Sequence, residues 1–328
     1  MKKIDLIDKK ILYHLDINAR QPFSQIGKKV GLHKNVVMYR VKKLIDANII
    51  KGFITNIDAF KLGFMSFRFL ISFQYASEEK RNEIIKYFSS NPNIWYLALM
   101  EGPYDLILNF WVNDISTFEN YWDKSLDKFR DYFRNYTFSI FTKTYHYNDS
   151  FLIEGKNVVK DRLDNEIINC KKYVSIDELD WQILNQIASN ARIPIVEIAR
   201  NLNITSMVAK YRLKQLMNKK IIQGFRVNIN IAKLGLKYFT IRIQLKHYQK
   251  RMPLINYIKL NPLVKMIDKA IGDSDLLIGI RSSSVDTIQK IISDLEKHFP
   301  NCIKSYDYYY FSALDKLNFL PKNNEIEF

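Results

Sequence analysis

The chain has 328 residues, 47% of them hydrophobic, and a formal net charge of +16, so it is long enough for several domains that each bury a core. Its longest apolar runs fall short of the ~18 residues that a membrane-spanning helix needs, which predicts a cytoplasmic protein without membrane association. Two cysteines and five histidines are scattered without metal-ligand spacing, so we expect no metal, no cofactor and no catalytic centre.

The stretch from Asp5 to Gly63 occurs twice in the chain, and the second copy begins 172 residues after the first. The register holds without a gap, as the return of Asn18-Ala19-Arg20 at Asn190-Ala191-Arg192 illustrates. A shared register of this length indicates a duplicated module rather than chance similarity.

The first copy is predicted to contain three helices and a strand. Asp5 is placed to cap the first helix, Pro22 separates this helix from the second, and Gly31 ends the second. The third helix is expected over about residues 34–47, and residues 49–54 are expected to form a strand that turns into a short hairpin, or wing. Such a module is typical of a winged helix-turn-helix, whose third helix reads DNA.

Basic residues are concentrated in the two copies: residues 1–64 hold 13 Lys and Arg against five Asp and Glu, and residues 173–236 hold nine against four. This balance predicts a polyanionic partner, and a cationic third helix suits the major groove of double-stranded DNA. The expected DNA contacts are His33, Lys34, Asn35, Met38, Tyr39, Arg40, Lys42 and Lys43 in the first copy, and Thr205, Ser206, Met207, Lys210, Tyr211, Arg212 and Lys214 in the second.

Two of these candidates have a second interpretation. Arg40 and Arg212 are also placed to form an ion pair with Asp8 and Asp180 of the first helix in each module. Lys42 and Lys214 are therefore the clearer candidates for phosphate contacts.

A second repeated unit follows each module, with the predicted element order βαββαβ that is typical of a ferredoxin-like fold. The fold class is therefore α+β, with two winged helix-turn-helix domains that alternate with two ferredoxin-like domains. The expected boundaries are 1–64 and 175–236 for the DNA-binding domains, 65–147 and 237–320 for the ferredoxin-like domains, 148–174 for a linker and 321–328 for a tail.

The repeated module resembles the DNA-binding domain of the Lrp/AsnC, or feast/famine, regulators. The resemblance rests on Asp5-x-x-Asp8-x-x-Ile11-Leu12, Asn18-Ala19-Arg20, Ile26, Gly31-Leu32, Arg40-Val41-x-x-Leu44, Ile49-Ile50-x-Gly52 and Leu62-Gly63. The βαββαβ unit similarly resembles the family's amino-acid-regulated (RAM) domain, so nearly the whole chain is covered twice. The family commonly has Ser at the start of the third helix, where this chain has His33 and Thr205.

The resemblance implies a nucleoid-associated transcription regulator that binds double-stranded DNA and self-associates through its RAM domains. Dimers of this family pair their RAM sheets back to back, so one chain with two halves is expected to form a covalent pseudo-dimer. The first turns of the two third helices differ, since His33-Lys34-Asn35 stands opposite Thr205-Ser206-Met207. Because recognition helices contact bases with their N-terminal residues, we expect two dissimilar half-sites about one helical turn apart.

The resemblance also implies an amino acid or another small molecule as effector, bound at a loop between two strands of each RAM domain. The matching residues are Gly102, Tyr104, Asp105, Gly272 and Asp275. A glycine allows a ligand to approach the backbone, and an aspartate accepts hydrogen bonds from an ammonium group. The same residue types also occur in an ordinary β-turn, which is the alternative interpretation.

Two further functions are open alternatives. Siroheme decarboxylases of the haem pathway resemble the same two-domain unit and need histidines in the RAM-like pocket, for which His146 and His247 are the candidates near predicted strands. An architectural protein that coats DNA with little sequence preference is the other alternative. Two basic reading helices favour a regulator, so we expect no enzymatic activity.

Overall fold

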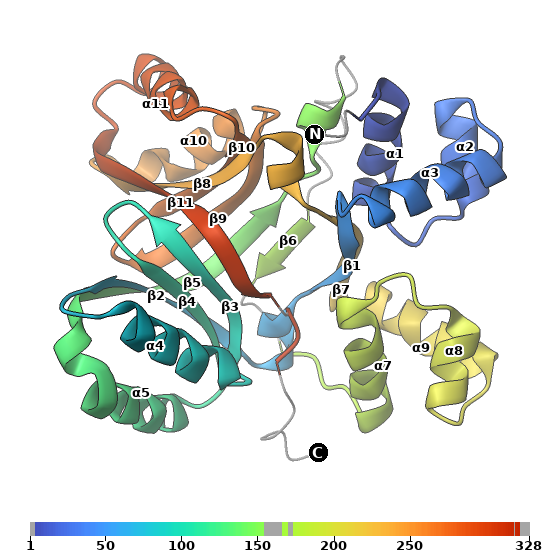
Figure 1. Ribbon diagram of the computed structural model, residues 1–328, viewed down its shortest axis with the longest axis horizontal. Coiled ribbons are helices and arrows are strands. Elements are labelled where there is room, and N and C mark those ends of the chain that lie inside the picture. The colour runs from blue at the N-terminus through green and yellow to red at the C-terminus, as the bar shows by residue number, and fades with distance from the viewer. Residues whose placement is uncertain (1–3, 154–165, 170–172, 318, 322–328) are drawn as a thin grey trace.

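The computed structural model describes residues 4–153, 166–169, 173–317 and 319–321. Two helix-turn-helix domains lie side by side at one end of the molecule, and two ferredoxin-like domains form the other end (Figure 1). The predicted α+β architecture with two alternating domain pairs is confirmed. Within the described residues, no helix is both long enough and apolar enough to cross a membrane.

The first helix-turn-helix domain forms because capping residues set its helix ends and an apolar stripe joins its helices. Asp5 and Asp8 form a reciprocal capping box at the first helix, which confirms the predicted cap. Gly31 ends the second helix in the left-handed conformation, with φ of 71°. Buried Ile11, Leu15, Val37, Val41 and Leu44 belong to one core. The elements are α1 (Leu6–Ile17), α2 (Phe23–Val30), α3 (Lys34–Asp46) and β1 (Ile50–Ile57).

The second domain repeats this arrangement, with Asp177 as the N-cap of its first helix. Its core contains Ala209, Leu213 and Leu216 at the positions that match Val37, Val41 and Leu44. Its elements are α7 (Glu178–Ser189), α8 (Ile195–Asn201), α9 (Ser206–Asn218) and β7 (Ile222–Ile229).

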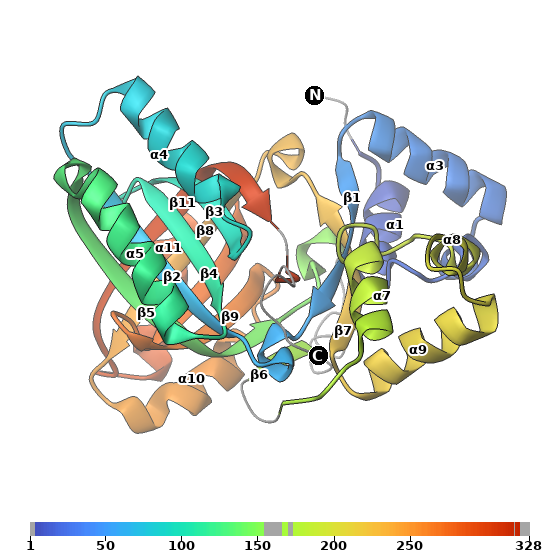
Figure 2. The same cartoon turned by 90° about the horizontal axis from the view of Figure 1, so that it is seen from below.

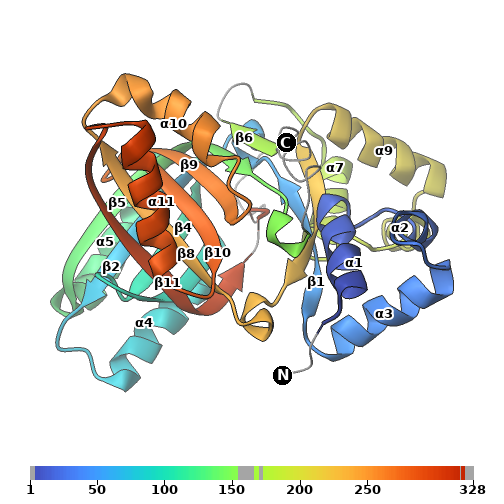
Figure 3. The same ribbon diagram turned by 90° about the horizontal axis from the view of Figure 1, so that it is seen from above.

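The strand after each third helix differs from the expected wing. β1 does not turn back into a hairpin; it continues to Ile57 and pairs antiparallel with β7 of the other half. The first helix of each half also packs on the strand of the other, α1 on β7 and α7 on β1. The sequence of one module predicts a strand but does not indicate its partner. That partner is the equivalent strand of the second module. The two DNA-binding domains are thereby joined through a two-stranded ribbon (Figure 3).

Each ferredoxin-like domain has the predicted βαββαβ order, with the helices packed on one face of its sheet. The first domain consists of β2 (Met65–Phe73), α4 (Glu78–Ser90), β3 (Ile94–Glu101), β4 (Leu106–Val112), α5 (Ile115–Phe129) and β5 (Phe133–His146). The second consists of β8 (Lys237–Leu245), α10 (Arg251–Ile258), β9 (Val264–Gly272), β10 (Leu276–Ser282), α11 (Asp286–His298) and β11 (Ile303–Leu317).

The two ferredoxin-like sheets join edge to edge and close into a barrel. β3 pairs with β11, β5 pairs with β9, and β5 also pairs with β2, so the strand order β2-β4-β3-β11-β8-β10-β9-β5 returns to its start. The four helices of these domains lie outside the barrel (Figure 2). Edge pairing was not expected from the back-to-back arrangement that the family resemblance implies. It removes the open sheet edges that would otherwise be free to pair.

The expected linker, residues 148–174, contains two described segments that contact the domains. A short 3-10 turn at Ser150–Leu152 packs with α1, and β6 (Glu166–Asn169) pairs antiparallel with β5. Residues 154–165 and 170–172 of this linker and residues 322–328 of the expected tail lie outside the described residues.

Candidate DNA interface and central cavity

The third helices α3 and α9 present nearly all of the predicted DNA contacts to solvent. Tyr39 is 66% exposed and Met207 is 80% exposed, although both are large apolar or aromatic side chains. The exposed members of the predicted set are His33, Lys34, Asn35, Met38, Tyr39, Lys42 and Lys43 on one helix, and Thr205, Ser206, Met207, Lys210, Tyr211 and Lys214 on the other. An exposed surface that combines apolar and cationic side chains is typical of a site that binds a partner.

The residues that open these two helices are both N-caps, and they differ in geometry. Thr205 Oγ1 accepts a hydrogen bond from the Val208 N–H at 3.2 Å. His33 Nδ1 accepts from the Asn35 N–H at 3.4 Å, which is a longer and weaker cap. Both residues fill the place where the family commonly has Ser, and both keep the capping role.

Arg40 and Arg212 form the ion pairs that were the second interpretation of these residues. Arg40 Nη1 lies 2.7 Å from Asp5 Oδ2 and 2.8 Å from Asp8 Oδ1. Arg212 Nη1 lies 2.6 Å from Asp177 and 3.4 Å from Asp180, so the second module repeats the bond. Both arginines are half-buried, and their pairs tie the third helix of each module to the start of its first helix.

The β1–β7 ribbon holds the two DNA-binding domains through reciprocal bonds across a pseudo-two-fold axis. The Ala19 N–H donates to Phe225 O at 2.8 Å, and the Ala191 N–H donates to Phe53 O at 2.9 Å. Arg20 Nη1 donates to Ala191 O at 2.8 Å, while Arg192 donates to Ala19 O. The repeated Asn-Ala-Arg tripeptide therefore serves the junction between the modules.

The two loops that the resemblance assigns to an effector are engaged in packing. Gly102 and Gly272 have φ of 137° and 129°, where an L side chain is strained. A Cβ at Gly272 would lie 2.6 Å from Phe138 O, and one at Gly102 would lie 3.3 Å from Tyr308 O. Both neighbours belong to the other half of the chain, so these glycines permit the edge pairing of the barrel.

The other loop residues are hydrogen-bonded within the structure. Asp105 accepts from the Phe73 N–H and Asp275 from the Leu245 N–H, each at 2.7 Å. Tyr104 is buried, and its hydroxyl lies 3.5 Å from Arg242 Nη2. The structure thus gives the five predicted effector residues structural partners, as in the alternative interpretation of an ordinary turn, and their role toward an effector stays a prediction.

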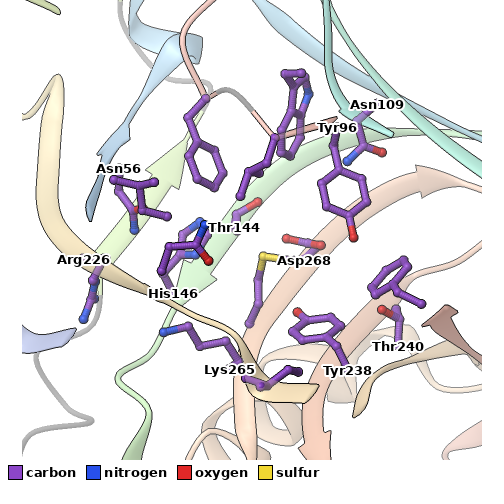
Figure 4. Close-up of a pocket in the computed structure, with 18 of the residues that line it drawn as sticks. Asn56, Tyr96, Asn109, Thr144, His146, Arg226, Tyr238, Thr240, Lys265 and Asp268 are labelled. Carbon is purple, nitrogen blue, oxygen red and sulfur yellow. The ribbon is translucent and has the colours of Figure 1, made fainter. Parts of the chain in front are cut away.

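A cavity of about 600 Å³ lies between the β1–β7 ribbon and the mouth of the barrel (Figure 4). Its walls come from both halves, and its lining includes Trp95, Tyr96, Arg226, Tyr238 and Lys265. This volume is within the range of small-molecule sites in proteins. Our sequence analysis did not identify this cavity, because its residues are spread over eleven strands from both halves of the chain.

Buried charges join the two ends of the molecule beside this cavity. We call Asp16, Asp149, Arg226, Lys265 and Arg281 the interdomain charge cluster. Lys265 Nζ lies 3.2 Å from Asp16 and 3.3 Å from Asp149. Arg226 Nη1 lies 3.8 Å from Asp16, and Arg281 forms an ion pair with Asp149. Asp16 belongs to α1 and Lys265 to β9, so the cluster connects a DNA-binding domain to the barrel.

The environment of the cavity shifts the pKa values of several lining groups, among them His146 and Asp268. Burial, together with the charges of Arg226 and Lys265, lowers the pKa of His146 from 6.5 to about 3, so its imidazole is neutral near pH 7. Burial raises the pKa of Asp268 to about 6, although Arg68 and Thr144 partly offset this effect. His146 lines the cavity, as one alternative required, whereas His247 is exposed outside it.

Comparisons with known proteins agree with the domain arrangement. Residues 4–45 match the AsnC-type helix-turn-helix domain, and residues 176–223 match a winged helix-turn-helix DNA-binding family. Over its whole length the fold is similar to the crystal structure of the siroheme decarboxylase NirDL, with a TM-score of 0.65, 14% identity, and coverage of 98% of this chain and 95% of that one. At such an identity the likeness concerns the fold alone.

Curated relatives are similar in sequence to one half of the chain. The HTH-type transcriptional regulator LrpA of Bacillus subtilis is 34% identical over 127 residues, which is 36% of this chain and 93% of the relative. The regulator LrpB of the same organism is 32% identical over 127 residues, 36% of this chain and 85% of the relative. The chain therefore belongs to the Lrp/AsnC family of transcriptional regulators, with helix-turn-helix DNA-binding domains in both halves.

Proposed function

We propose that this regulator reads two dissimilar half-sites of double-stranded DNA as a covalent pseudo-dimer. The observation that carries the proposal is the ribbon of β1 and β7, which joins two recognition helices with different exposed first turns. The two DNA-binding domains share one scaffold, which includes the reciprocal hydrogen bonds of Arg20 and Arg192 to the other domain. Since base contacts come mainly from the N-terminal residues of such helices, unequal first turns favour unequal half-sites.

Selection of bound duplexes from a random pool tests this proposal directly. We expect two different sequence motifs in a fixed order, spaced by about one helical turn of DNA. A perfect palindrome would contradict the proposal. Failure to enrich any motif, with a small ratio of specific to non-specific affinity at one salt concentration, would instead favour the DNA-coating alternative.

Lys42 and Lys214 are proposed to contact phosphates, because both are exposed and neither forms an ion pair with another described residue. Replacement of either lysine by Ala should weaken binding to all sequences alike and lower the slope of log K against log salt by about one unit. Titrations at several salt concentrations, on selected and scrambled duplexes, measure both effects. An exposed lysine far from the interface, Lys304 on β11, is the matched control and should leave the slope unchanged.

We further propose that a small effector modulates DNA binding and that chains self-associate through the outer surfaces of their RAM domains, since the sheet edges already pair within one chain. A nucleoid-associated location follows from the proposed function. The enzymatic alternative is not favoured, because the similar curated proteins are named as transcriptional regulators. Calorimetry with a panel of amino acids tests the effector at the loops around Gly102 and Gly272.

A further inference from the structure

We propose that the central cavity binds a small molecule with a planar aromatic body and an acidic group at one end. A second part of this inference, which rests on the proposed function, is that the bound molecule changes the affinity for DNA. The cavity is distinct from the two strand-connecting loops that the family resemblance implies.

Broken pseudo-symmetry gives the cavity two chemically different ends. Strands β3 and β4 of the first ferredoxin-like domain correspond to β9 and β10 of the second with an offset of 170 residues. Lys265 therefore corresponds to Trp95, and Arg281 corresponds to Trp111. All four side chains line the cavity. The second half of the chain thus has cationic side chains at the positions where the first half has indole rings. An amphipathic ligand therefore has one preferred orientation.

The cavity-lining residues of the two DNA-binding domains also differ, with a charged residue in one copy where the other has an apolar residue. With the offset of 172 residues, Arg226 on β7 corresponds to Ile54 on β1, and both residues line the cavity. Asp16 of the interdomain charge cluster corresponds to Ala188 on α7. Charged residues thus gather at one end from both domain types, and apolar residues replace them at the other end.

The charged end favours an anion. Six Lys and Arg side chains line the cavity, against the two carboxylates of Glu101 and Asp268. Asp16 and Asp149 balance two more of these cations, which leaves an excess of positive charge within the described residues. His146 adds none, because it is neutral. A carboxylate, sulfonate or phosphate of a ligand would be attracted by this excess positive charge and would accept hydrogen bonds from lining cations such as Lys265.

The opposite end favours a planar aromatic group. The rings of Trp95 and Trp111 stack with their centroids 5.1 Å apart and an interplanar angle of 20°. Phe60 meets Trp111 edge to face at 5.7 Å, and Phe319 lies 5.7 Å from Trp95. The Trp111 Nε1–H is buried and has no hydrogen-bond partner among the described residues, which is costly unless an acceptor reaches it. Aromatic rings of a ligand would extend this wall.

Between the two ends lie polar groups that can fix the orientation of a ligand. Figure 4 shows the Tyr96 hydroxyl and the Asp268 carboxylate facing the interior from opposite halves of the barrel. Asp268 is 1% exposed, and its ion pair with Arg68 Nη2 is long, at 3.7 Å. A few such groups within apolar walls are typical of sites that hold one class of small molecule.

The position of the cavity explains why occupancy would affect DNA binding. Its walls include Ile54 and Asn56 of β1 and Arg226 of β7, on the ribbon that sets the two recognition helices. The opposite walls belong to the barrel. A ligand that contacts both the ribbon and the barrel stabilises the relative position of the two in which those contacts form. It therefore shifts the affinity for DNA by as much as its own affinity differs between this position and others.

Two dyes with the same aromatic body separate the charged from the apolar contribution. 8-Anilinonaphthalene-1-sulfonate is anionic, and N-phenyl-1-naphthylamine is its neutral counterpart. With the intact full-length chain, we expect one dye per chain and a dissociation constant at least tenfold lower for the anion, measured by calorimetry and dye fluorescence. Equal affinity for both dyes, or several weak sites per chain, would overturn the proposal.

Variants locate the dye within the cavity. Lys265→Gln should remove most of the preference for the anionic dye, whereas Lys269→Gln, on the same strand but outside the cavity lining, should retain it. Met266→Trp, which fills part of the cavity, should weaken both dyes and provides a second test if Lys265→Gln does not fold. Equal dye affinities in the parent and Met266→Trp proteins would place the dye elsewhere and reject the site.

DNA titrations with and without saturating anionic dye test the coupling. We expect at least a threefold change in the dissociation constant for the selected duplex in the parent protein, and none in Met266→Trp. Dye binding without any effect on DNA affinity would refute the coupling and leave the ligand site standing. A protein that binds dye but no DNA would instead contradict the proposed function.

Discussion

Replacing His33-Lys34-Asn35 by Thr-Ser-Met should make the protein prefer a palindromic DNA site with two identical half-sites. The substitution gives α3 the first turn of α9 on an otherwise repeated scaffold, and it supplies Thr as a stronger N-cap than His33. Because each mismatched base pair costs ~1–3 kcal/mol, affinity for the parental site should fall about 10- to 100-fold relative to the new palindrome. Random-pool selection followed by competition binding measures this change.

The reciprocal exchange is the matched control for this prediction. Thr205-Ser206-Met207 replaced by His-Lys-Asn should yield a palindrome of the other half-site, with the same overall fold and similar salt dependence. If both exchanged proteins still select the parental sequence, the first turns do not carry the specificity, and the two-reader proposal fails.

Replacing Asp16 by Asn should destabilise the whole chain. Asp16 is fully buried, accepts a 2.6 Å hydrogen bond from the Asp149 N–H, and pairs with Lys265 and Arg226. Asn cannot balance these cations, and breaking a buried pair in this way costs ~3–5 kcal/mol. The free energy of unfolding from urea titrations gives the loss. Asp46→Asn, at an exposed position on α3, should change it by less than ~0.5 kcal/mol.

The dependence of this loss on pH follows from the pKa of Asp16. Burial alone would raise that pKa, but Lys265, Arg226, the Asp149 N–H and Arg281 together hold it below the ordinary value of 3.8. A carboxylate with a lowered pKa in the folded state stabilises the protein above its unfolded pKa. The difference between the parent and Asp16→Asn should therefore be constant from pH 5 to 7 and shrink as pH falls below about 4. A difference that grows with acidification would contradict the assigned ion pairs.

Both predictions depend on positions where the two halves of the chain differ. Duplication supplies a common scaffold, and Asp5, Asp177, Arg40 and Arg212 make equivalent bonds in the two DNA-binding modules. The residues that determine DNA sequence preference and ligand binding are expected at positions where the two copies differ. These positions are the first turns of α3 and α9, and the cavity, where Lys265 corresponds to Trp95. A single chain permits such differences because the two halves are no longer constrained to be identical.

The sequence by itself determined the repeat, the α+β architecture, the helix caps and the exposed faces of the recognition helices. These features depend on local pattern: a cap residue, an apolar stripe and a basic face each lie within a few turns of the chain. The choice between an ion pair and a phosphate contact for Arg40 needed the tertiary structure, because both fit the same helix face.

Only the tertiary structure decided how the halves meet. Strand 50–57 carries no local sign that its partner is 222–229 instead of a hairpin strand, since any extended backbone offers the same hydrogen-bonding groups. Closure of the barrel depends likewise on Gly102 and Gly272 meeting strands far away in the sequence. The cavity exists because these long-range pairings leave space between the ribbon and the barrel, with charge at one end and indole rings at the other.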